Sequence, residues 1–123
     1  LATMDVLQHT SILEESSSVL APYFAASLAS LVDHPVVGEV RCEGLLAAVE
    51  LVADKASRER LAPESAGAVY TRDRAIENGL MVRQTGDAMI MSPPFVTSKA
   101  EIDALVSKLT GALDKTAAFY GLN

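Results

Sequence analysis

A single arginine stands between two short apolar runs in the stretch GLMVRQTGDAMIMSPPF, residues 79–95. The guanidinium of Arg83 carries parallel N–H donors that match a carboxylate, and a glycine-containing turn follows it, so the side chain could reach outwards to a substrate. The alternative is an exposed arginine that pairs with nearby Asp87, an interaction worth at most about 1 kcal/mol. Residue types and spacing alone favour the alternative, because most surface arginines do no more.

The other residues with chemical potential lack the neighbours that catalysis or metal binding needs. His9 and His34 have no cysteine or carboxylate at metal-ligand spacing, so both are expected at the surface. Cys42 has no evident general base and is expected to be a small buried filler. The lysines are all expected to be solvated and unreactive: Lys55, Lys99, Lys108 and Lys115. No catalytic, cofactor-binding or metal-binding residue is therefore predicted in this chain.

Two helical segments are predicted before the first strand. Residues 1–8 form a short one, and residues 12–32 form a long amphipathic helix. Pro22 removes a backbone donor inside the long helix, so a kink or a break near Ser18 is expected. The apolar stripe of the long helix consists of Leu13, Leu20, Phe24, Leu28 and Leu31.

Pairs of strands alternate with helices in the rest of the chain. The predicted strands cover residues 36–41, 45–52, 80–83 and 88–92, with an exposed loop over 53–67 and a turn over 84–87. A helix over residues 66–77 ends at Asn78 and Gly79. The closing helix starts at Ser98 with capping-box spacing, and its buried stripe is Ile102, Leu105, Leu109 and Leu113. This order predicts an α+β fold, a small sheet covered by helices.

Size, composition and charge limit the classes of function. The chain has 123 residues, half of them hydrophobic, which suits one packed domain. A net charge of −6 without any run of lysine or arginine argues against nucleic acid or an anionic membrane as a partner. The lone Cys42 favours a reducing, cytoplasmic location. Because the sequence opens within a predicted helix and without methionine, we expect a piece of a longer protein.

Two stretches carry a resemblance to a known family: HPVVGEVRCEGLLAAVELVADKASRER and, after it, ENGLMVRQTGDAMIMSPPFVTSKAEIDAL. Over residues 1–120 the chain resembles the C-terminal small domain of class III pyridoxal-phosphate-dependent aminotransferases, in particular ω-transaminases of the amine:pyruvate type. The resemblance implies a small, mostly antiparallel sheet of about four strands. It also implies that residues 1–123 are one small domain, without the large domain that binds pyridoxal 5'-phosphate through its lysine.

The same resemblance assigns a role to Arg83. In the family motif GL-x-x-R, the arginine is a mobile switch that binds the carboxylate of an oxo acid and swings out for an apolar amine. Acetylornithine- and ornithine-type relatives carry a second arginine three residues before the two prolines, where this chain has Ile90. That difference favours the amine:pyruvate branch. Cys42 departs from the family, which usually has glycine there.

The resemblance thus implies a substrate-recognition part of a transaminase that acts on an amine and pyruvate or another oxo acid. The full-length enzyme is expected to be a homodimer, and this chain alone is expected to be inactive. Two alternatives stay open. One is a stand-alone small-molecule-binding or regulatory module, because fold alone does not fix function. The other is a dimerisation fragment, which would form a stable dimer indifferent to any oxo acid.

Overall fold

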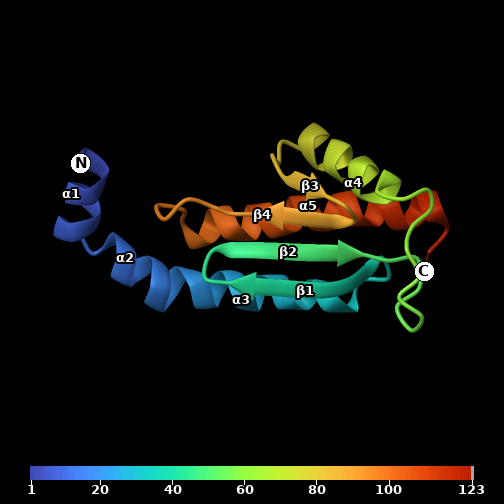
Figure 1. The fold of residues 1–123 in the computed structure, drawn as a ribbon, viewed down its shortest axis with the longest axis horizontal. Coiled ribbons are helices and arrows are strands. Elements are labelled where there is room, and N and C mark those ends of the chain that lie inside the picture. Colours follow the sequence, from blue (N-terminus) through green and yellow to red (C-terminus); the bar gives the residue numbers. More distant parts are fainter. Residues whose placement is uncertain (123) are drawn as a thin grey trace.

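The computed structural model describes residues 1–122 and has the α+β fold expected (Figure 1). A run of helical segments comes first, a hairpin follows, and a second hairpin lies between two further helices. None of the helices in the described part of the chain combines the length and apolar character that a membrane span needs. The elements are α1 (Ala2–His9), α2 (Ile12–Glu15), π-helical η1 (Ser16–Leu20), α3 (Ala21–Ala29), 3-10 helical η2 (Ser30–Asp33), β1 (Val37–Glu43), β2 (Leu46–Leu51), α4 (Ala66–Glu77), β3 (Arg83–Thr85), β4 (Ala88–Met91) and α5 (Lys99–Tyr120).

The four strands form one antiparallel sheet in the order β1-β2-β4-β3. This confirms the expected number of strands and places β3 at an edge of the sheet. Figure 1 shows the strands in front of α3 and α5, whose axes run along the sheet. Helix α3 packs on β1, and α4 packs on both α5 and β3.

The two faces of the sheet differ in what covers them. Side chains alternate between the faces along each strand, and directly paired residues share a face. The inner face joins the helices in one core, and its strand members include Ala47, Val49, Leu51, Met89 and Met91. The outer face carries exposed or half-buried side chains, among them Glu39, Arg41, Ala48, Ile90 and Arg83.

The long N-terminal helix is continuous, but its hydrogen bonds change register where a break was expected near Ser18. Residues 16–20 are π-helical, and the amide of Ala21 donates to the carbonyl of Ser16. Pro22 follows directly and has no amide hydrogen, which accounts for the local change. The predicted stripe is confirmed in the core except for Leu13, which is 45% exposed. Leu13 belongs to α2, in the part of the helical run that extends beyond the sheet (Figure 1).

The first strand of the second hairpin lies later in the chain than the sequence predicted, whereas the second strand starts at Ala88 as expected. Strand β3 starts at Arg83 and ends at Thr85, whereas residues 80–82 approach it without a strand partner in the described chain. Thr85 pairs with Ala88, so the loop contains two residues rather than four. Gly86, the first of them, has a φ of +57°, a conformation that glycine adopts without strain and that two-residue hairpins use. The prediction of a strand over 80–83 was therefore wrong.

Helix α5 begins with the predicted capping box. The amide of Glu101 donates to Ser98 Oγ, while the amide of Ser98 donates to Glu101 Oε2 at 2.7 Å. These two bonds satisfy backbone donors that the first turn of a helix leaves unpaired. The bonds from Ser98 also lower the pKa of the Glu101 carboxyl below its usual 4.5.

We expect Ser98→Ala to lower the free energy of unfolding by about 1 kcal/mol at pH 7, because one cap bond is lost and its reciprocal partner is weakened. A carboxyl with a lowered pKa stabilises the fold above its unfolded pKa, and this contribution disappears as the pH falls through the folded pKa. The difference between wild type and variant should therefore shrink in acid. Thermal unfolding at pH 7 and at pH 3 measures both values. A difference that grows in acid would contradict this account.

Candidate functional site

Arg83 lies on the outer face of the sheet, at the first position of the edge strand β3. It pairs with Ile90, which pairs with Ala48, which in turn pairs with Arg41. One row across the four strands therefore has an arginine at each end and two apolar residues between them. Strand pairing and the alternation of side chains place Arg83 on the face that the helices leave open.

The two arginines of this row differ in their partners. The guanidinium of Arg41 bonds to Glu39 at 2.9 Å and to Glu50 at 2.8 Å. These two carboxylates raise the pKa of Arg41, and Glu50 contributes the larger part. The Arg83 side chain is exposed and forms no hydrogen bond or ion pair with any residue between 1 and 122. Its donors are therefore available to a ligand.

Asp87, which the alternative interpretation made the partner of Arg83, bonds to other residues instead. Its carboxylate accepts hydrogen bonds from Arg60 Nε and, at 2.9 Å, from the amide of Ser65. The side chain is only 6% exposed. The interpretation of Arg83 as the partner of Asp87 is therefore wrong, because the two-residue loop turns Asp87 towards residues 60–65.

A groove of about 720 Å³ runs past the start of β3, and Arg83 lines it. One wall is a stripe of α5 at helical spacing, formed by Glu101, Ala104, Leu105 and Lys108. The other wall comes from residues 79–83 and 90–94. Arg83 and Lys108 are the cations that line the groove. Glu101, the carboxylate among its lining residues, is engaged in the capping box. Apolar walls with a bidentate cation suit a small molecule that has a carboxylate and a short apolar part.

Ile90 lies beside Arg83 in the groove, as its direct cross-strand partner. An arginine at this position would place a second guanidinium next to the first. With isoleucine, the pair of positions carries one positive charge and one apolar surface. The geometry thus joins the two positions that the sequence analysis singled out, although they are seven residues apart.

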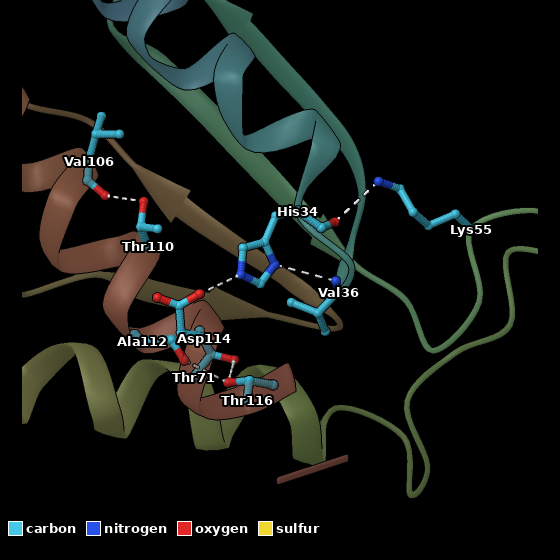
Figure 2. Close-up of polar contacts among 9 residues, drawn as sticks. All are labelled: His34, Val36, Lys55, Thr71, Val106, Thr110, Ala112, Asp114 and Thr116. Carbon is cyan, nitrogen blue, oxygen red and sulfur yellow. Dashed lines mark hydrogen bonds and ion pairs between the residues drawn. The ribbon is translucent and has the colours of Figure 1, made fainter. Parts of the chain in front are cut away.

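His34 is not a surface residue, contrary to the expectation. Its side chain is 10% exposed, and Nε2 lies 3.1 Å from Asp114 Oδ1 on α5 (Figure 2). Its Nδ1 accepts a hydrogen bond from the amide of Val36 at 3.4 Å. His34 thus ties the start of β1 to α5. Its partner is 80 residues away, which sequence spacing could not indicate. His9 is exposed, as expected.

Cys42 is half-buried beside the core, which agrees in part with the expected buried filler. Burial, with a smaller contribution from Glu43, raises the pKa of its thiol. A thiol in this state is a weak nucleophile at neutral pH. In the described part of the chain, no group of three or more histidines, cysteines or carboxylates could hold a metal ion.

The lysines do not fit a site that binds pyridoxal phosphate through an imine. All four are exposed, as expected, whereas a reactive lysine needs a desolvated or cationic setting. Lys55 donates to the carbonyl of His34 (Figure 2) and to that of Val32. Lys99 lies 5.0 Å from the centre of the Tyr23 ring. Among residues 1–122, no lysine has the setting that an imine with this cofactor needs.

Lys108 is the residue of the groove that the sequence analysis missed. Its Nζ donates to the carbonyl of Gly79 at 3.2 Å. The sequence placed Lys108 on the solvated side of the last helix, and that is correct. No pattern indicated that this side of the helix faces the segment leading to Arg83, 25 residues earlier in the chain.

Comparisons with known proteins agree with the fold. The family model "Aminotransferase class-III" matches residues 1–113. The putrescine–pyruvate aminotransferase of Pseudomonas aeruginosa is 40% identical over 118 residues, which are 96% of this chain and 26% of that protein. The chloroplastic gamma aminobutyrate transaminase 3 of Solanum lycopersicum is 34% identical over 116 residues, which are 94% of this chain and 22% of that protein.

Solved structures show the same likeness. The omega transaminase of Pseudomonas jessenii in complex with PMP superposes with a TM-score of 0.89 at 32% identity, over 95% of this chain and 26% of that one. The PMP-bound aminotransferase of Vibrio fluvialis gives a TM-score of 0.86 at 32% identity, over 93% of this chain and 25% of that one. The chain thus spans about a quarter of the length of these relatives.

Proposed function

Because this chain belongs to the class III aminotransferase family, we propose that it is the C-terminal small domain of a transaminase that moves an amino group between an amine and pyruvate or another oxo acid. Support for pyruvate comes from the name of the Pseudomonas aeruginosa relative. Support for the domain assignment comes from the share of the relatives that the chain covers. A large domain outside residues 1–123 would complete the enzyme.

Within this enzyme, Arg83 recognises the carboxylate of the oxo acid. The observation that carries this assignment is an exposed guanidinium without a partner in residues 1–122, in a groove whose walls are largely apolar. Two parallel N–H···O bonds to a carboxylate contribute about 1.5 to 3 kcal/mol where water is partly excluded. The long side chain starts at an edge strand, so it can turn towards solvent when an uncharged amine takes the same place.

Pyridoxal 5'-phosphate is the cofactor of the proposed enzyme and is held by the large domain, because the lysines of this chain do not fit that task. Two structures similar to this chain are bound to PMP, which supports the cofactor class. The homodimer and the cytoplasmic location stay predictions. The lone Cys42 favours a reducing compartment such as the cytoplasm. One tomato relative, in contrast, is chloroplastic.

The experiment that tests the function is an amino-transfer assay on the protein that contains this chain with its large domain. With pyridoxal phosphate present, we expect transfer from a diamine such as putrescine to pyruvate. Alanine formation is the readout, and succinic semialdehyde, an oxo acid of different length, is the comparison acceptor. If no combination of amine and oxo acid yields product, the transaminase proposal fails.

A further inference from the structure

Few hydrogen bonds fix the backbone of the segment that leads to Arg83. Residues 80–82 lie outside the sheet ladder, so no strand hydrogen bonds define their path within the described chain. At the helix end, the amide of Gly79 donates to Ile76 and that of Leu80 to Ala75, both at 2.9 Å. Leu80 and Val82 are buried, while Met81 between them is exposed.

One side chain from another element reaches this segment. Lys108 Nζ donates to the Gly79 carbonyl at 3.2 Å, and no other side chain among residues 1–122 hydrogen-bonds residues 79–82. The contact suits the electrostatics, because Gly79 follows directly after the C-cap of α4, where the negative end of the helix dipole favours a cation. It also depends on Gly79, whose φ of +74° favours glycine and where a Cβ would lie 3.4 Å from the ammonium.

Lys108 itself stands on a well-fixed support. It lies in the middle of α5, whose opposite face places Ile102, Leu109 and Leu113 fully in the core. The adjoining positions Leu105 and Ala104 form the wall of the groove that faces Arg83. The hydrogen bond from Lys108 to Gly79 therefore holds the start of the segment at a fixed distance from α5, the wall against which a ligand of Arg83 would lie.

We propose that Lys108 is a positioning residue for Arg83: by holding the Gly79 carbonyl, it fixes the path of residues 79–82 and so the point from which the Arg83 side chain enters the groove. This inference rests on the proposed function of Arg83 as the carboxylate-binding residue. The ammonium acts through the backbone, four residues before the guanidinium that contacts the substrate.

The test compares steady-state kinetics of the full-length enzyme and three variants. Lys108→Met keeps most of the unbranched side chain and removes the donor, whereas Lys108→Arg keeps a donor. Lys115→Met is the matched control, because Lys115 is exposed two helical turns further along the same face of α5. We expect Lys108→Met to raise the KM for pyruvate roughly three- to tenfold, the effect of one lost hydrogen bond. The KM for an uncharged amine and kcat should stay unchanged, and Lys108→Arg should restore most of the affinity.

The same substitution in an Arg83→Ala background separates positioning from direct binding. If Lys108 acts through Arg83, Lys108→Met causes no further rise in the KM for pyruvate there. A further rise would show that the ammonium binds the carboxylate itself and would overturn the proposal. Amide hydrogen exchange gives a readout independent of activity: residues 80–82 should exchange faster in Lys108→Met than in Lys115→Met, and equal rates would also overturn it.

Failure of this inference is distinguishable from failure of the proposed function. If Arg83→Ala raises the KM for pyruvate while Lys108→Met changes neither that KM nor the exchange of residues 80–82, the positioning role alone is refuted. If Arg83→Ala leaves the KM for pyruvate unchanged, the carboxylate role of Arg83 is refuted and the positioning role with it.

Discussion

Arg83→Ala is expected to raise the KM for pyruvate roughly 10- to 100-fold and to leave the KM for an uncharged amine within about twofold. The large effect follows from the loss of a bidentate, charge-assisted pair in a partly apolar groove, worth about 1.5 to 3 kcal/mol. The fold loses little, because the Arg83 side chain is exposed and bonds to no other residue between 1 and 122. Steady-state kinetics with each substrate varied in turn measures the two constants.

Two further variants make this result specific. Arg83→Lys keeps the charge but loses the planar fork, so it should recover only part of the affinity for pyruvate. Arg41→Gln changes an arginine on the same face and in the same cross-strand row, but one held by Glu39 and Glu50. It should leave the KM for pyruvate unchanged. Equal losses for pyruvate and the amine in Arg83→Ala would refute a carboxylate-specific role.

Asp87→Ala is expected to lower the free energy of unfolding by about 2 to 4 kcal/mol. The carboxylate is almost fully buried, and its removal leaves the Ser65 amide without its acceptor. The share due to Arg60 is small, because that side chain is 58% exposed and solvent screens the pair. Urea denaturation followed by circular dichroism measures the change.

Asp73→Ala is the matched control for this prediction. Asp73 also pairs with an arginine, at 2.7 Å from Arg72, but its side chain is 47% exposed. An exposed pair of this kind contributes at most about 1 kcal/mol. If both substitutions cost the same, burial of the Asp87 carboxylate is not the source of its effect, and the ion pair with Arg60 is.

The helices were predictable from the sequence, because their apolar positions repeat over many residues. The limits of α4 agreed with the prediction, and the capping box located the start of α5. The first strand of the second hairpin was misplaced, because the apolar residues 80–82 look like a strand. Leu80 and Val82 are buried outside the sheet ladder instead, while Met81 between them is exposed, and the tight loop at Gly86 sets the register.

The candidate site was predictable in one respect only. The resemblance to a family motif singled out Arg83 and Ile90, while spacing alone favoured a pair between Arg83 and Asp87. That pair is absent because Asp87 faces residues 60–65, a contact across more than 20 positions. The contact of Lys108 with Gly79 and that of His34 with Asp114 could not be predicted for the same reason. Both depend on which sides of distant helices and loops face each other, and a local sequence pattern does not contain that information.

The two-residue loop of the second hairpin fixes the pairing that keeps Arg83 on the open face of the sheet. Side chains alternate along a strand, so a slip of β3 by one residue against β4 would move Arg83 from the register of Ile90 to that of a core-facing neighbour such as Met89 or Met91. A slip of two residues would return it to the open face. The pairing of Thr85 with Ala88 next to the loop therefore decides on which face the guanidinium lies.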